Sequence, residues 1–265
     1  ASAWGALPKR IRCRGKMIQL SYIDTAFLND DDVFLKHLDR MSEYRKKKTE
    51  SLKLRSDKNL SLGAGILMSN FLSEIGKSEK KMKYSHTANG KPVFCDLPGV
   101  YFNISHSGTV ALAAFSDCEI GCDIEEIGQA KLDLAKRFFC SEEYDLLLME
   151  ADPEKRNLLF FRIWTLKESF IKMLGCGMKL PLNSFLLHFE EGGEKPEVTA
   201  EIKPEAAKII GIREINRIAD KKKDLAFNEV LEFNEYFDIP GFCTACCSKG
   251  RHPAPALCRI DPNQL

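Results

Sequence analysis

Apolar and polar residues follow two different periods along this chain, and each period predicts a type of secondary structure. Within 120–125 the apolar side chains at even positions alternate with Gly121, Asp123 and Glu125, which is the period of a strand with one buried face. Such a strand would project both carboxylates from its other face. Within 57–75 the apolar positions keep helical spacing, which predicts a long helix.

The same criteria, applied to the rest of the chain, predict a mixture of helices and strands. The predicted helices span 31–41, 42–54, 57–75, 131–138, 141–149 and 154–174. The predicted strands span 18–23, 93–94, 101–104, 109–116, 120–125, 184–189, 196–202, 208–213, 230–236 and 242–247. Ser105 and His106 fall between two of these strands, where we expect a tight turn that displays both side chains.

Composition narrows the class of protein. The chain has 265 residues, of which 44% are hydrophobic, enough for one large core or two modest ones. Its 39 basic and 38 acidic residues give a formal net charge of +1, which does not favour a nucleic-acid or other polyanion binder. No apolar run reaches the length of a membrane span, so we expect a soluble protein without a membrane partner.

Neither end of the chain shows the periodicity of the rest. Residues 1–16 are basic and lack an ordered apolar pattern, whereas 249–265 contains Pro253, Pro255 and Pro262. We expect 1–16 to be a loose tail or an expression remnant, and 249–265 to be a disordered tail.

Ten cysteines are scattered through the chain with no apolar signal segment ahead of them. This distribution favours reduced thiols and a cytoplasmic location over a disulfide scaffold. Cys243 and Cys246 form a C-x-x-C pair, but no second pair follows at zinc spacing and the run lies in a predicted strand. The pattern therefore does not favour a metal site there.

Three carboxylates are candidates for binding one hard cation: Asp123 and Glu125 on the predicted strand, and Glu168 on the helix at 154–174. Magnesium prefers such oxygen ligands and commonly adds substrate phosphate and water. The pattern alone also allows a simpler interpretation, in which the strand pair is a solvated face and Glu168 forms an i,i+4 ion pair with Lys172. Both interpretations stay open at this level.

Four motifs, taken in order, resemble those of the 4'-phosphopantetheinyl transferases, and most closely the bacterial type that activates surfactin synthetase. They are Gly90-Lys91-Pro92, Phe102-Asn103-Ile104-Ser105-His106-Ser107-Gly108, Gly121-x-Asp123-Ile124-Glu125 and Trp164-x-x-Lys167-Glu168-Ser169-Phe170-x-Lys172. The resemblance extends over about 17–248. It implies an α+β fold of two pseudo-symmetric lobes in one chain, with coenzyme A bound between them.

The resemblance implies the limits of these lobes, an N-terminal lobe at 17–118 and a C-terminal lobe at 119–248 that carries the metal site. A glycine followed by small apolar residues occurs at both 108–114 and 241–247, and this weak echo agrees with two related lobes without proving them. The resembling proteins act as monomers, so a monomer is expected here as well.

The activity that the resemblance implies is the conversion of a carrier protein from its apo to its holo form. A serine of an acyl or peptidyl carrier receives the phosphopantetheine arm of coenzyme A, and adenosine 3',5'-bisphosphate is released. The carrier would serve fatty acid, polyketide or nonribosomal peptide biosynthesis. Magnesium, with manganese as an alternative ion, is the implied cofactor.

The resemblance also assigns individual residues. Asp123, Glu125 and Glu168 become metal ligands, and Glu168 also becomes the base for the carrier serine, directly or through a metal-bound water. Lys172 is assigned to catalysis on the pyrophosphate side. The residues implied to contact coenzyme A are Lys47, Lys58, Lys91, Ser105, His106 and Lys172.

The sequence departs from the family at the adenylate end of the coenzyme A site. Tyr44 occupies the first of two lysine positions, with Lys47 at the second, and Lys58 stands where relatives often carry arginine. A lysine lacks the bidentate geometry of arginine. The basic run at 45–48 can also be an ordinary solvated helix face.

Two further expectations concern the partner and the competing functions. Basic and apolar side chains after the predicted metal strand could dock an acidic carrier helix, although core packing explains the phenylalanines equally well; they are Lys131, Lys136, Arg137, Phe138 and Phe139.

The competing functions are a catalytically silent carrier-protein or nucleotide-binding module, and a metal-dependent hydrolase that cleaves a pyrophosphate with water.

Overall fold

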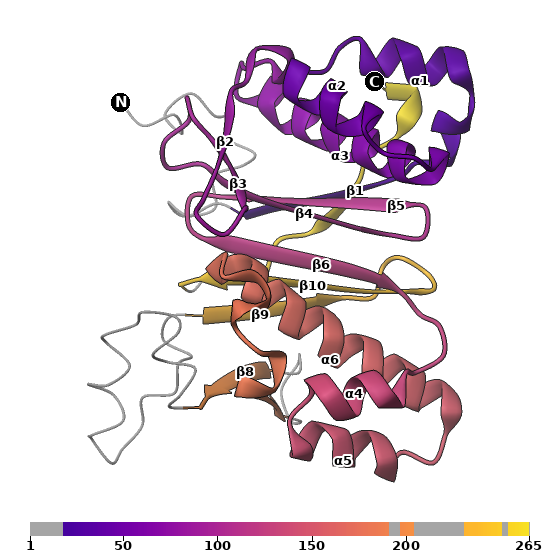
Figure 1. The fold of residues 1–265 in the computed structure, drawn as a ribbon, viewed down its shortest axis with the longest axis vertical. Coiled ribbons are helices and arrows are strands. Elements are labelled where there is room, and N and C mark those ends of the chain that lie inside the picture. The colour runs from indigo at the N-terminus through magenta and orange to yellow at the C-terminus, as the bar shows by residue number, and fades with distance from the viewer. Residues whose placement is uncertain (1–17, 191–196, 204–230, 251–253, 265) are drawn as a thin grey trace.

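The structure is a computed structural model that describes residues 18–190, 197–203, 231–250 and 254–264. Its elements stack in layers, with helices above one sheet and further helices below a second sheet (Figure 1). The two sheets face each other in the middle of the molecule. The α+β fold class expected from the sequence is confirmed.

The first half of the chain forms the upper layers. Strand order in its sheet is β11-β1-β5-β4, and the helices cover the outer face of this sheet (Figure 1). Its elements are β1 (Ile18–Asp24), α1 (Asp31–Leu38), α2 (Glu43–Glu50), α3 (Arg55–Glu74), β2 (Tyr84–His86), β3 (Pro92–Phe94), β4 (Tyr101–Ser107) and β5 (Val110–Ser116).

The second half forms the lower layers around a sheet of order β6-β10-β9. Helix α6 lies directly against this sheet, and α4 and α5 lie on the side of α6 that faces away from the sheet (Figure 1). The elements are β6 (Ile120–Glu126), α4 (Leu132–Phe138), α5 (Ser141–Met149), α6 (Pro153–Leu174), β7 (Phe185–Glu190), β8 (Glu197–Ile202), β9 (Leu231–Tyr236), β10 (Phe242–Lys249) and β11 (Leu257–Arg259).

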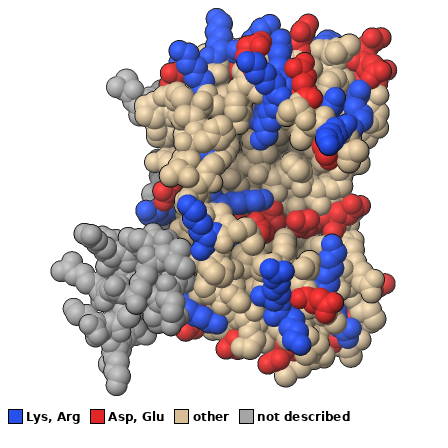
Figure 2. Space-filling model, in the orientation of Figure 1, with Lys and Arg blue, Asp and Glu red and all other residues tan. Residues whose placement is uncertain are grey.

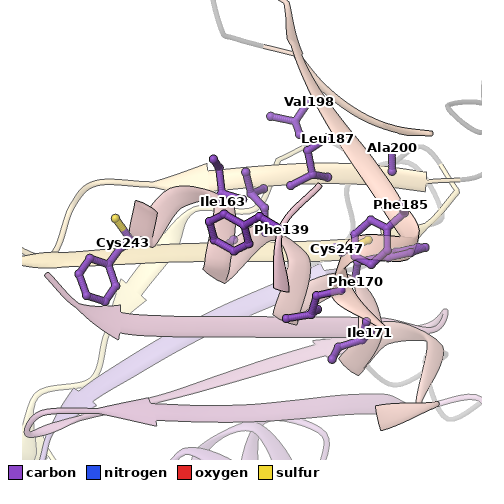
Figure 3. Packing of buried hydrophobic residues seen from close by; sticks show 14 of the residues in the cluster. Phe139, Ile163, Phe170, Ile171, Phe185, Leu187, Val198, Ala200, Cys243 and Cys247 are labelled. Carbon is purple, nitrogen blue, oxygen red and sulfur yellow. The ribbon is translucent and has the colours of Figure 1, made fainter. Parts of the chain in front are cut away.

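Buried apolar side chains form three clusters that follow these layers. One lies between the first sheet and its helices and includes Phe71 stacked on Phe115 at 4.0 Å. A second surrounds α6, between the second sheet on one side and α5, β7 and β8 on the other, and Figure 3 shows Phe139, Phe170 and Phe185 among its aliphatic neighbours. The third fills the space between the sheets. The predicted lobe limits, 17–118 and 119–248, stay a prediction.

Strand β4 is longer than the sequence predicts, and this changes the position of two candidate residues. Ser105 and His106 were expected in a turn, but they pair with Leu112 and Ala111 in the β4–β5 ladder. The turn begins at Gly108, whose φ of 55° suits glycine. The expectation that a turn displays both residues is therefore wrong, because ladder hydrogen bonds extend the strand through Ser107.

Strand β6 agrees with its predicted range, and the alternative interpretation of a solvated carboxylate face is wrong for Asp123. Both of its faces are covered over most of its length, and Asp123 is only 2% exposed. Ile120, Cys122 and Ile124 pack between the two sheets, as the alternation predicts. The face that carries the carboxylates is covered as well, because α6 packs on it.

The C-terminal segment also differs from expectation. Residues 249–265 were expected to form a disordered tail, but β11 pairs in parallel with β1 and so adds a strand to the first sheet. Backbone hydrogen bonding to an open sheet edge explains this order despite the prolines.

The predicted strand 208–213 and the predicted tail 1–16 lie outside the described residues. Among the helices that are described, none combines the length and apolarity needed to cross a bilayer.

Candidate active site

Two strands from different sheets bring the first site residues together. Strands β4 and β6 run side by side, so that residues 105 and 107 face residues 123 and 125. The Ser105 hydroxyl donates a hydrogen bond of 2.7 Å to Oδ1 of Asp123. The Ser107 hydroxyl donates one of 3.1 Å to Oε2 of Glu125. The two carboxylates therefore lie on the same face of β6, as the alternation predicts.

Helix α6 supplies the other charged groups. Its N-terminus is capped by Asp152, whose side chain accepts from the backbone of Glu154, and its C-terminus ends at Gly175 in the left-handed conformation. Glu168 and Lys172 are one helical turn apart, so both side chains project on the same side. That side faces β6.

The close contact between α6 and β6 depends on one glycine. A Cβ atom added at Gly121 would lie 2.0 Å from the carbonyl oxygen of Ser169 and 2.3 Å from the backbone nitrogen of Met173. The helix backbone therefore rests directly on the strand at this point. This contact places Glu168 and Lys172 against Asp123, which is two residues further along β6.

Asp123 and Lys172 form a partly buried ion pair. Nζ of Lys172 lies 2.6 Å from Oδ1 of Asp123 and 3.0 Å from the hydroxyl of Ser105. Burial by itself acts to lower the pKa of Lys172, but the charge and hydrogen bond of Asp123 raise this pKa above its ordinary value. The ammonium group therefore stays charged, and it pairs with Asp123 rather than with Glu168.

The second carboxylate oxygen of Asp123 has no such partner. Oδ2 is buried and accepts no hydrogen bond from any described residue. A buried carboxylate oxygen without a donor is uncommon in a native structure and calls for a missing ligand such as water or a cation. Glu125 and Glu168 lie close enough to Asp123 for its negative charge to act on both.

Glu125 and Glu168 have raised pKa values. Burial is the main cause for each, and the negative charge of Asp123 adds to it. The charge of Glu168 also raises the pKa of Glu125, although Ser107 and Lys172 act in the opposite sense. Three neighbouring carboxylates, two of them with raised pKa values and the third with an unpaired oxygen, have a charge and donor set that suits a divalent cation, because a cation would relieve the repulsion.

His106 lies between basic groups of the two halves of the protein. Burial is the main cause that lowers its pKa, followed by the positive charges of Lys172 and Lys48, while Asp57 acts in the opposite sense. Lys172 comes from α6, whereas Lys48 and Asp57 come from α2 and α3. Figure 2 shows one face of the molecule, on which acidic side chains form a band across the middle, with basic side chains above and below it.

The basic run at 45–48 does not form one solvated face. Arg45 is buried and donates to the carbonyl oxygen of Ser61 at 3.5 Å, and Lys46 lies near Asp39 and Glu43. Lys48 is the member whose charge reaches His106. It was missed in the sequence, although it lies one helical turn after Tyr44 and so on the same side of the helix.

The other predicted coenzyme A contacts are less closely placed. Lys47 is exposed on α2, and Lys58 is half-buried in the first turn of α3. Tyr44 stacks on Tyr84 at 4.8 Å, and its hydroxyl lies 3.1 Å from Nε2 of His86. These positions put the three residues on the helical side of the first half, and their contacts with coenzyme A stay predictions.

Lys91 is not directed at the carboxylates. Its ammonium group donates to the backbone carbonyl oxygens of Ile120, Lys172 and Met173, at 2.9, 2.8 and 3.2 Å. Burial lowers the pKa of Lys91, while Glu119 acts in the opposite sense. Contact between Lys91 and a phosphate stays a prediction, and this placement does not support it.

Lys167, the first lysine of the W-x-x-K-E motif, is a structural residue. It is fully buried, forms an ion pair of 2.8 Å with the buried Glu143, and donates to the carbonyl oxygens of Leu182 and Phe185. Glu143 in turn accepts from the backbone of Cys140 and Leu187. This network joins α5, α6 and β7, so Lys167 holds α6 in place.

The candidate carrier-docking residues divide into surface and core. Lys131, Lys136 and Arg137 are exposed, whereas Phe139 is 4% exposed and packs against Phe160 at 5.5 Å. Phe138 is half-buried against Trp164. Core packing therefore accounts for Phe139.

The C-x-x-C pair is part of the core. Cys243 is 1% exposed and Cys246 is fully buried, and both thiols are free. Burial raises the pKa of both thiols, which keeps them protonated and makes them poor metal ligands. In the described part of the chain, no three His, Cys, Asp or Glu side chains lie together as a preformed metal site.

Comparison with known proteins identifies the family. Residues 119–220 match the family model described as the 4'-phosphopantetheinyl transferase superfamily. The chain is 36% identical over 155 residues to 4'-phosphopantetheinyl transferase Sfp of Bacillus subtilis (strain 168), which covers 58% of this chain and 69% of that protein. It is 42% identical over 106 residues to 4'-phosphopantetheinyl transferase psf-1 of Bacillus pumilus, or 40% of this chain and 45% of that protein.

Among solved structures, the holo-[acyl-carrier-protein] synthase of Thermotoga maritima aligns with a TM-score of 0.33 and 20% identity, over 51% of this chain and 64% of that one. This likeness is too weak to carry an argument, so the assignment rests on the sequence matches. The chain belongs to the 4'-phosphopantetheinyl transferase superfamily. It is a transferase that moves the phosphopantetheine arm of coenzyme A onto a carrier protein, as the motifs predict.

Proposed function

We propose that Asp123, Glu125 and Glu168 bind one divalent cation, Mg²⁺ or alternatively Mn²⁺, during this transfer. The observation that carries the proposal is the buried Oδ2 of Asp123, which has no donor among the described residues and lies near two carboxylates of raised pKa. When bound, the cation would supply positive charge to the pyrophosphate of coenzyme A and to the leaving phosphate.

Glu168 is the proposed proton acceptor for the carrier serine. The serine oxygen forms a bond to the phosphorus that bears the pantetheine arm, and the bond to the bridging oxygen breaks to release adenosine 3',5'-bisphosphate. The serine proton passes to Glu168, directly or through a water molecule. The pKa of Glu168 is raised in the metal-free site, but a bound cation would lower it, which favours the route through a water molecule.

Lys172, Ser105 and His106 are the proposed partners of the pyrophosphate. The ammonium of Lys172 already sits between Ser105 and Asp123, and His106 lies within reach of the charge of Lys172. Such charge-assisted contacts bind phosphate oxygens strongly. Lys47 and Lys58 are proposed for the adenylate end, and Lys48, whose charge acts on His106, is proposed beside the pyrophosphate.

One reaction mixture tests the proposal. Apo carrier protein, coenzyme A and enzyme are incubated with Mg²⁺, with Mn²⁺ or with a chelator, and the carrier is weighed by mass spectrometry. A covalent gain that needs the cation supports the proposal, and a gain that persists in chelator contradicts the metal. Free phosphopantetheine would indicate a hydrolase, and binding without reaction would indicate a silent module.

We also make proposals about the cellular location and the oligomeric state of the protein. The buried cysteines Cys122, Cys140, Cys243, Cys246 and Cys247 are free thiols, which supports a reducing, cytoplasmic environment. We also propose a monomer with lobes at 17–118 and 119–248. Light scattering of the purified chain measures its mass, and a dimer would contradict the proposed state.

A further inference from the structure

Lys91 has no hydrogen-bonding capacity left over for a ligand. A lysine ammonium carries three donors and no acceptor. In this structure all three reach backbone carbonyl oxygens, those of Ile120, Lys172 and Met173, at 2.9, 2.8 and 3.2 Å. A phosphate could bind the ammonium only if it displaced one of these carbonyls, which would leave a buried acceptor without a donor.

Two of the three carbonyls belong to the C-terminal turn of α6. The last four carbonyls of a helix have no partner within the helix. In α6 the carbonyl of Ile171 accepts from the backbone of Gly175, and those of Lys172 and Met173 accept from Lys91. A cation at this end also interacts favourably with the helix dipole. Lys91 therefore caps α6 from outside the helix.

The third carbonyl belongs to the first residue of β6. Ile120 lies next to Gly121, where α6 and β6 are in backbone contact. One ammonium group thus joins the end of α6 to the start of β6. The residues that form the proposed metal site lie on these same two elements, with Asp123 and Glu125 on β6 and Glu168 on α6.

Lys91 reaches this position from the first half of the chain, where its backbone is held. The backbone of Thr87 donates to the carbonyl of Lys91 at 2.9 Å, and the backbone of Lys91 donates to the hydroxyl of Thr87 at 3.2 Å. The same turn is tied to the segment after α6 by Lys179, whose Nζ lies 2.6 Å from Oδ1 of Asn89.

The path of the Lys91 side chain depends on the residue that ends α6. Gly175 has a φ of 65°, and a Cβ atom added there would lie 3.2 Å from Cδ of Lys91. Glycine at this position therefore both ends the helix and leaves room for the lysine stem.

We propose that Lys91 is a positioning residue that fixes α6 against β6, so that Glu168 keeps its distance from Asp123 and Glu125, and that it is not a phosphate ligand. The inference rests on the proposed function, because it assigns a purpose to the spacing of the three carboxylates. Small displacements matter in such a site, since a shift of about 1 Å remote from the chemistry can lower a rate by about 10²-fold.

The test compares Lys91→Met with His106→Ala, which removes a proposed phosphate contact. Carrier modification at varied coenzyme A gives kcat and KM, calorimetry without metal gives the Kd of coenzyme A, and electron paramagnetic resonance gives the Kd of Mn²⁺. Lys91→Arg keeps the charge and several donors, and serves as the conservative variant. Lys83→Met, at an exposed position just before β2, is the control for loss of a surface charge.

Lys91→Met is expected to lower kcat by about 10- to 100-fold and to weaken Mn²⁺ binding, with the Kd of coenzyme A within about twofold of the wild type. Lys91→Arg should recover most of kcat, and Lys83→Met should behave as the wild type. His106→Ala should instead raise the Kd of coenzyme A. If Lys91→Met melts below the assay temperature, Lys91→Gln, which keeps an amide donor, undergoes the same measurements.

Two results would overturn the inference. One is a Kd of coenzyme A raised about tenfold or more with kcat unchanged at saturating substrate, which would make Lys91 a phosphate ligand. The other is no change in either constant. Failure of the proposed metal site gives a different result, because the wild-type enzyme would then bind no Mn²⁺ and would modify the carrier in the presence of chelator. In that case the role of Lys91 is still decided by whether Lys91→Met changes kcat or the Kd of coenzyme A.

Discussion

Replacing Glu168 with glutamine separates its proposed catalytic role from an ordinary place on the helix surface. The change keeps the shape and helix propensity of the side chain but removes its charge and its basicity. In the structure Lys172 pairs with Asp123 and not with Glu168. Glu168→Gln therefore breaks no ion pair, and a purely structural Glu168 would tolerate it.

The expected activity loss is large. General acid–base groups contribute typically about 10²- to 10⁴-fold, and a 10²-fold loss corresponds to about 2.7 kcal/mol of activation free energy. Glu168→Gln would remove the proton acceptor and one of three metal ligands together. We expect carrier modification to slow by at least about 10²-fold, measured by mass spectrometry at saturating coenzyme A.

The expected stability change has the opposite sign. Burial, with the charge of Asp123, raises the pKa of Glu168, so the ionised side chain destabilises the fold at every pH above its raised pKa. This penalty is absent below the ordinary glutamate pKa of about 4.3. Without metal, the glutamine variant should therefore melt higher than the wild type at neutral pH, and the difference should disappear at acidic pH.

The two measurements are made on the same preparation. For a chain of this size about 1 kcal/mol of unfolding free energy moves the melting temperature by roughly 2 to 4 °C, which calorimetry resolves. Glu126→Gln, at the exposed end of β6, is the matched control and should change neither quantity. A Glu168→Gln enzyme with wild-type turnover would refute the proposed site, and a lower melting temperature would refute the argument from repulsion.

Three further perturbations address the neighbouring residues. Asp123→Ala should reduce turnover by about 10² to 10⁴-fold and lower the free energy of unfolding by about 1 to 3 kcal/mol, since it leaves the ammonium of Lys172 without its carboxylate partner. His106→Ala should weaken coenzyme A binding by about 1.5 to 3 kcal/mol. Because the pKa of His106 is lowered in the free enzyme, coenzyme A should bind more tightly as the pH falls below about 6.5, and calorimetry of the variant should lack this gain. Gly121→Ala should destabilise the protein by at least about 2 kcal/mol, measured by urea unfolding, because the methyl group would meet the backbone of Ser169.

Each of these has a distinct contrary outcome. Full turnover of Asp123→Ala in saturating Mg²⁺ would remove Asp123 from the metal site. An unchanged pH dependence of coenzyme A affinity in His106→Ala would remove the imidazole from phosphate binding. A Gly121→Ala protein as stable as the wild type would show that α6 can move away from β6 without loss.

Much of this protein was predictable because the determining interactions are local. The alternation at 120–125 sets β6 with Asp123 and Glu125 on one face, and the helical period at 154–174 gives α6 with Glu168 and Lys172 one turn apart. The spacing of four short motifs was enough to recognise the family. The positions of these residues on β6 and α6 follow from chain geometry over a few residues and need no knowledge of the fold, whereas the family was recognised from a resemblance of motifs.

The tertiary structure alone decided what each charged group contacts. Ser105 and His106 lie on a strand because β5 pairs with them, and Lys172 binds Asp123 because backbone contact at Gly121 brings α6 onto β6. Lys91 donates its three hydrogen bonds to backbone carbonyl oxygens of residues that are 29 to 82 positions away in the chain. A long, flexible side chain has no preferred partner in the sequence itself, and its role depends on which buried polar groups the folded backbone leaves without a donor.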